Sequence, residues 1–130
     1  MARRKTVPAA PVVLDSSCWL EYFSNSPRAK RYAEVIENTA ALIVPIITLY
    51  EVYKVALREF GVAHANQAVA LMREGDVIDI NLNIALSAAA NGLPMADSLI
   101  YATAQMRGAT LWTQDVHFKA LAGVKFFDRD

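Results

Sequence analysis

The chain has 130 residues with no formal net charge, and 55% of them are hydrophobic. This length suits one domain with a full core, and this composition excludes an intrinsically disordered chain. The balanced charge excludes a protein that holds nucleic acid by overall charge alone. No apolar run approaches the roughly 20 residues that span a bilayer, so we expect no association with a membrane.

The first eleven residues are basic and lack the apolar stretch of a secretory signal, so we predict a flexible tail ahead of one domain over residues 12–130. The single cysteine, Cys18, can form neither an internal disulfide nor a thiolate zinc site. The two histidines, His64 and His117, are too far apart for a zinc motif on one helix. One free cysteine is typical of a reducing compartment, and we expect a cytoplasmic location.

Five short β-type runs alternate with helical patterns along the chain. Strands are predicted over Val12–Asp15, Leu42–Pro45, Val77–Ile80, Thr110–Thr113 and Lys125–Asp128. Helices are predicted over Ser17–Phe23, Arg28–Glu37, Thr48–Phe60, Ala63–Glu74, Leu82–Ala90, Ala96–Arg107 and Val116–Leu121. The first four strands are mostly apolar, which is typical of strands buried on both faces, whereas the last suits an edge. The alternation predicts an α/β fold, with a parallel sheet covered by helices on both faces.

Four acidic residues stand at the starts of predicted helices, and each has a purely structural explanation. Asp15 follows the first strand and Asp115 the fourth, where either could cap the next helix. Glu51 comes three residues after Thr48, which is the spacing of a capping box. Asp97 lies in a first helical turn, where the helix dipole favours a negative charge.

Taken together, the four acids favour one site. Asp15 and Asp115 both follow strands, Glu51 lies one turn into the helix that leaves the second strand, and Asp97 opens the helix that leads to the fourth. All four are therefore expected near the carboxyl edge of the sheet, where parallel sheets bind ligands. The residues alone do not give the order of the strands in the sheet, so they do not show which of the acids lie next to one another.

Converging carboxylates need either protons or a cation. Two charges about 4 Å apart repel by about 4 kcal/mol at an effective dielectric constant near 20. Oxygen donors without a thiolate favour Mg²⁺ or Mn²⁺, and such a site suits the hydrolysis of phosphodiester bonds.

Several polar residues near these acids could assist. Ser16 and Thr113 could hold water or a phosphate oxygen. Lys54 and Arg58 lie on the same side of the predicted helix as Glu51 and could contact a phosphate, although a solvated face is the simpler interpretation. For His117, a position facing solvent at a helix start is favoured over a role as a metal ligand.

Four stretches, in this order, resemble the PIN-domain family and in particular the VapC-type toxins of prokaryotic toxin–antitoxin pairs. They are Val13–Ser17, Pro45–Val52, Met95–Ala104 and Leu111–Phe118. The resemblance implies a three-layer α/β/α sandwich with strand order 3-2-1-4-5, in which the first and fourth strands are neighbours. The chain departs from the family pattern at Gln114, where members often carry a basic residue, and in its longer N-terminal tail.

The resemblance also implies a metal-dependent endoribonuclease that binds Mg²⁺ or Mn²⁺ through the four acids. By position, the metal-site residues are Asp15, Glu51, Asp97 and Asp115, with Thr113 or Ser16 in support. The implied substrate is RNA, often structured RNA such as tRNA. The implied partners are a second copy, giving a homodimer, and an antitoxin protein that covers the acidic pocket.

Other functions fit the residues less well. A non-toxin PIN nuclease in RNA processing is hardly separable by sequence, and a PIN fold that only binds RNA would not need all four acids. A receiver-like signalling domain expects paired acids after the first strand, but Ser16 follows Asp15, and no lysine ends the fifth strand. A phosphatase with an Asp-x-Asp pair is opposed by serine at position 17.

Overall fold

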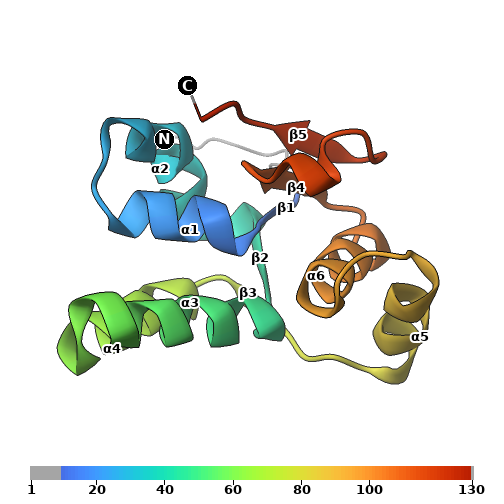
Figure 1. The fold of residues 1–130 in the computed structure, drawn as a ribbon, viewed down its shortest axis with the longest axis horizontal. Helices are drawn as coiled ribbons and strands as arrows, with labels where there is room; N and C mark the ends of the chain where they lie inside the picture. Colours follow the sequence, from blue (N-terminus) through green and yellow to red (C-terminus); the bar gives the residue numbers. More distant parts are fainter. Residues whose placement is uncertain (1–9, 130) are drawn as a thin grey trace, which may run out of the picture.

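A computed structural model describes residues 10–129 and contains one five-stranded parallel sheet of order β3-β2-β1-β4-β5 (Figure 1). The strands are β1 (Val12–Leu14), β2 (Leu42–Pro45), β3 (Asp76–Ile78), β4 (Thr110–Thr113) and β5 (Val124–Phe126). The predicted strand order is confirmed, and β1 and β4 are neighbours. Of the predicted tail, residues 1–9 lie outside the described part of the chain.

The helices follow the strands in the expected alternation. They are α1 (Ser16–Phe23), α2 (Lys30–Glu37), α3 (Ile46–Phe60), α4 (Val62–Met72), α5 (Leu82–Ala90) and α6 (Met95–Met106). Short 3₁₀ helices cover Pro27–Ala29, Thr39–Ala41 and Val116–Phe118. No helix among the described residues is both long and apolar enough to cross a membrane.

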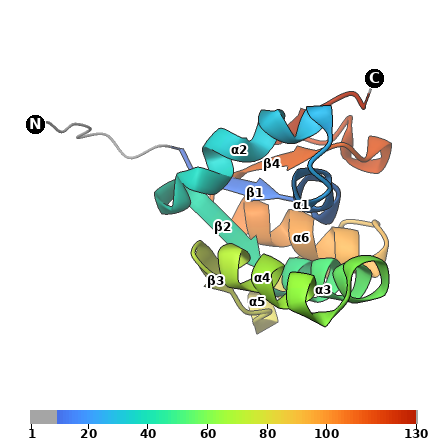
Figure 2. The same ribbon diagram turned by 90° about the vertical axis from the view of Figure 1, so that its left-hand side faces the viewer.

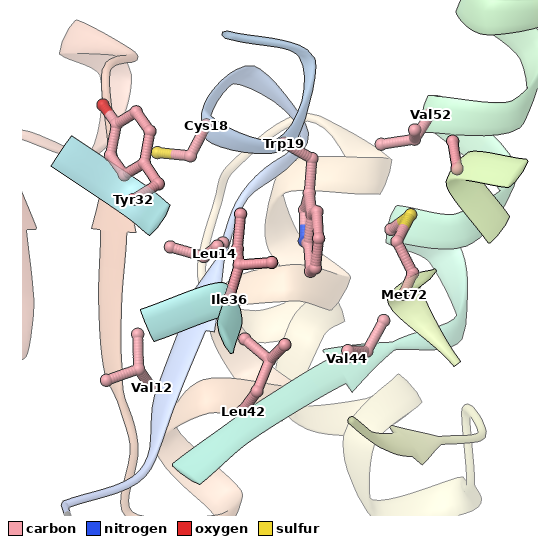
Figure 3. Close-up of a cluster of buried hydrophobic side chains, with 11 residues drawn as sticks. Val12, Leu14, Cys18, Trp19, Tyr32, Ile36, Leu42, Val44, Val52 and Met72 are labelled. Atoms are coloured by element: carbon pink, nitrogen blue, oxygen red, sulfur yellow. The ribbon is translucent and has the colours of Figure 1, made fainter. Parts of the chain in front are cut away.

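Alternate side chains of the central strands face two separate cores, which makes the fold a three-layer sandwich. Leu14 and Val44 point toward α1, α2 and α4, where Trp19 is fully buried between the β1 side chains and Met72 (Figure 3). Val13 of β1 instead packs with α6, and α5 covers the outer side of α6 (Figures 1 and 2). Because successive residues of a strand point to opposite faces, a three-residue strand serves both cores.

The start of α3 differs from the prediction. The helix begins at Ile46, directly after Pro45, and no side chain caps it. Thr48 lies inside the helix with its hydroxyl buried, so the capping-box interpretation of Thr48 and Glu51 is wrong. The physical reason is that Pro45 ends the strand with an extended backbone, and the apolar Ile46, which resembles a strand residue, can enter the helix at once.

The third strand also differs, because it is an edge. Asp76 is exposed, and the other two residues of β3 are only partly buried, so the prediction of burial on both faces is wrong for this strand. An edge strand has one neighbouring strand, which leaves part of it open to solvent. The last predicted helix is shortened to the 3₁₀ helix Val116–Phe118.

Candidate active site

Asp15 lies where β1 meets α1, at the carboxyl edge of the sheet. Its side chain is buried, with 4% exposure, and its backbone N–H donates to the carbonyl of Trp112 on β4 at 3.1 Å. The carboxylate accepts hydrogen bonds from the Ser17 hydroxyl at 2.6 Å and the Cys18 N–H at 3.2 Å, so it caps α1 as predicted. Burial raises the pKa of Asp15, although these hydrogen bonds oppose the shift.

Thr113 joins this acid to the next one. Its hydroxyl donates to Asp15 Oδ2 at 2.5 Å and accepts from the backbone N–H of Asp115 at 2.9 Å. Thr113 is fully buried at the end of β4, so both bonds are shielded from water. The pairing of β1 with β4 therefore fixes the relative position of Asp15 and Asp115 through a single hydroxyl.

Asp115 caps the 3₁₀ helix Val116–Phe118. Its Oδ1 accepts from the backbone N–H of His117 at 2.9 Å, and His117 Nδ1 lies 3.2 Å from the same oxygen. The side chain of Asp115 is 32% exposed, so the carboxylate reaches the protein surface.

Asp97 lies in the first turn of α6 and is partly buried. Its pKa is raised to about 6, first by burial and then by the negative charges of Asp115, Glu51 and Asp15, in that order. One carboxyl group therefore responds to the other three acids, although the four come from separate stretches of the chain. Oxygens of Asp97 and Asp115 and a ring nitrogen of His117 all lie within 4.8 Å of one another.

Glu51 reaches the site from α3. It is the sixth residue of that helix, and its Oε1 accepts a hydrogen bond from the hydroxyl of Ser16, the first residue of α1. The bond connects α1 with α3 beside Asp15. In the described residues, Glu51 and Asp15 stand outside the compact group of Asp97, Asp115 and His117, although their charges act on Asp97.

The donor set fits a divalent cation. Within residues 10–129, no lysine or arginine forms an ion pair with any of the four carboxylates, and the only such partner is the imidazole beside Asp115. Negative charges held this close without a compensating base favour a bound cation. The residues that could hold it are Asp97, Asp115 and His117. Glu51 and Asp15 add negative charge that acts on Asp97.

Two neighbours of this site, His117 and Gln114, lie in different surroundings. His117 is exposed, as predicted, and a ring nitrogen lies within 4.8 Å of oxygens of Asp97 and Asp115, where it could act as a metal ligand. Its position two residues after Asp115 is the sequence signal for this placement. Gln114, at the position where family members often carry a basic residue, is buried, and its Nε2 donates to the Tyr32 hydroxyl at 2.7 Å. Its side chain therefore points into the protein, away from any substrate.

The two basic residues proposed for RNA contact are exposed on α3. Lys54 Nζ lies 5.8 Å from the ring centroid of Tyr50, and Arg58 pairs with its neighbour Glu59 at 3.2 Å. Neither engages an acid of the site among the described residues. Their contact with RNA stays a prediction.

Solved structures share this fold over nearly their whole length. A toxin–antitoxin complex from Klebsiella pneumoniae aligns with 90% of this chain and 96% of its own, with a TM-score of 0.74 and 23% identity. DNA-bound VapBC from Salmonella typhimurium aligns with 92% and 98%, with a TM-score of 0.71 and 19% identity. VapC20 of Mycobacterium tuberculosis, described as a toxin that cleaves the sarcin–ricin loop, aligns with 85% and 95%, with a TM-score of 0.71 and 17% identity.

At these identities the structures demonstrate a shared fold. No curated protein matches the chain by sequence. The family model described as the PIN domain, however, matches residues 12–124, which include all four acids, strands β1 to β4 and the first residue of β5. The chain belongs to the PIN-domain family.

Proposed function

We propose that this protein is a metal-dependent endoribonuclease that hydrolyses RNA phosphodiester bonds and acts as the toxin of a toxin–antitoxin pair. The observation that carries the proposal is the convergence of four carboxylates at the carboxyl edge of a PIN-domain sheet, expressed in the raised pKa of Asp97. Membership of this family leaves the receiver-like and phosphatase alternatives without support.

The protein contributes to this chemistry by holding the carboxyl groups in fixed positions. Asp15 is buried and held by three hydrogen-bond donors, so its carboxyl group has a fixed position beside the other acids. Asp97 and Asp115 lie nearer the surface, where an RNA phosphate could approach with the ion. When bound, Mg²⁺ or Mn²⁺ would neutralise these carboxylates, acidify a water molecule and stabilise charge on the phosphate.

The related structures support the choice of partners. Those from Klebsiella pneumoniae and Salmonella typhimurium contain toxin–antitoxin complexes, and VapC20 is described as cleaving the sarcin–ricin loop. We infer an antitoxin protein as partner, structured RNA such as tRNA as substrate, a homodimer as the assembly and the cytoplasm as the location. A small antitoxin-like reading frame beside the gene would favour the toxin over an RNA-processing nuclease.

The test is RNA cleavage by purified protein with Mn²⁺ or Mg²⁺. Asp97→Asn is the better inactive control, because no hydrogen bond among the described residues uses the Asp97 carboxylate, whereas Asp15 also caps α1. We expect cleavage by the wild-type protein, loss of cleavage in Asp97→Asn, and retention in the exposed-surface control Asp79→Asn. Equal cleavage by the wild-type and Asp97→Asn proteins, or tight RNA binding without cleavage in either metal, would contradict the proposal.

A further inference from the structure

We propose that His117 is a direct ligand of the metal, which makes the centre a mixed oxygen–nitrogen site that selects Mn²⁺ over Mg²⁺. This inference rests on the proposed function for the presence of a metal, and it adds the identity of one ligand and the metal preference that follows. It starts from the compact group of Asp97, Asp115 and His117, the only group of three or more metal-ligating side chains within this range of one another in residues 10–129.

The backbone holds His117 in place even though its side chain is 64% exposed. The Asp115 carboxylate accepts the His117 N–H at 2.9 Å. The next residue, Phe118, is fully buried and lies 6.4 Å from the ring of Tyr101 on α6, measured between ring centroids. The short helix is therefore anchored on both sides of His117, while the imidazole remains free to meet an ion and solvent.

The spacing of the donor atoms suits neighbouring ligands of one ion. At metal–ligand bonds of about 2.1 Å, two ligands at right angles lie about 3.0 Å apart and two opposite ligands about 4.2 Å apart. His117 Nδ1 and Asp115 Oδ1 are 3.2 Å apart, close to the separation of two ligands at right angles. An oxygen of Asp97 lies within 4.8 Å of the other donors, a limit slightly wider than the separation of opposite ligands. Asp97 comes from α6 rather than from the same turn, so the three donors converge from two separate elements.

Donor chemistry then decides the preference. Mg²⁺ is a hard ion that favours carboxylate and water oxygens, and it gains little from an imidazole. Divalent transition-metal ions gain more from a nitrogen ligand, and among them Mn²⁺ is the one that also suits carboxylate and water ligands. Because the side chains of His117 and Asp115 reach the surface, water or an RNA phosphate could approach an ion held there.

The test uses pulsed electron paramagnetic resonance of Mn²⁺ bound to the full chain, prepared without a histidine tag. A coordinated imidazole produces a nitrogen-14 modulation in the spin echo. The chain has only two histidines, so His64→Ala, on the exposed side of α4, is the matched control for His117→Ala. We expect the modulation in the wild-type and His64→Ala proteins and its loss in His117→Ala.

Affinities give a second measurement. Calorimetric titration should show Mn²⁺ affinity falling by at least about tenfold in His117→Ala, which is the lower end of the cost of losing a supporting residue at a metal site. Mg²⁺ affinity should change by less than about twofold, because carboxylates and water suffice for it.

The outcomes separate this inference from the proposed nuclease. Bound Mn²⁺ without nitrogen modulation would overturn the role of His117, even if the protein cleaves RNA. Equal losses of Mn²⁺ and Mg²⁺ affinity in His117→Ala would overturn the selectivity. Absence of Mn²⁺ binding would overturn the whole inference. Nitrogen modulation in a protein that cleaves no RNA would support the ligand while refuting the nuclease.

Discussion

The ionised carboxylate of Asp97 is expected to weaken the metal-free fold at neutral pH. Its pKa rises to about 6 because burial and three neighbouring carboxylates disfavour its charge. Replacing Asp97 with asparagine keeps the shape of the side chain and removes that charge. We therefore expect Asp97→Asn to be more stable than the wild-type protein in the absence of metal, although it should be inactive.

The direction and size of the effect follow from linkage. Below pH 3.8 the carboxyl is protonated in both the folded and the unfolded chain, so the charge costs nothing. The penalty grows as pH rises toward 6 and is complete above it. A rise from 3.8 to about 6 corresponds to about 3 kcal/mol. Screening by solvent around this partly exposed group reduces the expected gain in Asp97→Asn to about 1–2 kcal/mol at pH 7.5.

Urea unfolding at pH 4 and pH 7.5, with a chelator present, measures this difference. The stabilisation should be near zero at pH 4 and full at pH 7.5, and the exposed Asp79→Asn should show neither change. Saturating Mn²⁺ should then stabilise the wild-type protein more than Asp97→Asn, because binding to the folded state lowers its free energy. A free energy of unfolding that is lower in Asp97→Asn, or a gain independent of pH, would refute the argument that the four carboxylates repel one another in one site.

Three further substitutions probe the parts of the fold that hold the site, each by urea unfolding. Thr113→Val should lower the free energy of unfolding by about 1–3 kcal/mol and reduce RNA cleavage, because the buried Asp15 loses a hydrogen-bond donor. Thr113→Ser keeps the hydroxyl and should retain both stability and cleavage. Equal stability of the two variants would contradict this expectation. Gly75→Ala should lower the free energy of unfolding by about 1–3 kcal/mol, since an added Cβ would lie 2.9 Å from a backbone carbonyl oxygen of β2. An unchanged urea midpoint would show that β2 can shift to make room for the methyl group. Tyr32→Phe should cost about 1–3 kcal/mol by leaving the buried amide of Gln114 without its hydroxyl partner; a neutral effect would indicate that water replaces the hydroxyl.

Much of the fold was predictable because its strands are short, apolar and separated by clear helix signals. Two misjudged elements have a common cause. Whether Val77 is buried depends on its strand lying at the edge of the sheet, and whether Thr48 caps a helix depends on where Pro45 ends the preceding strand. Both are properties of the assembled sheet, and local composition does not contain them. Strand order itself came from family resemblance rather than from periodicity.

The proximity of the four acids could be predicted from the set better than from each residue alone, for a physical reason. The structural explanations offered for Asp15 and Asp115 are correct, since each caps the helix that follows it. Capping did not exclude a site, because the two oxygens of a carboxylate carry about four lone pairs, and the cap of Asp115 uses only one of those on Oδ1.

In a parallel sheet, the helices that follow the strands start at the carboxyl edge, and their N-terminal dipoles all favour negative charge there. The topology that favours acidic residues as helix caps therefore also brings their carboxylates close together at one edge of the sheet. What sequence could not supply was the orientation of the side chains between them. Gln114 and His117 are three residues apart on one turn, yet the first is buried against Tyr32 and the second extends into solvent beside the acids. Their roles differ because Gln114 is bound to both α1 and α2: its backbone N–H donates to the Ser17 hydroxyl at 3.3 Å, and its side-chain amide donates to the Tyr32 hydroxyl.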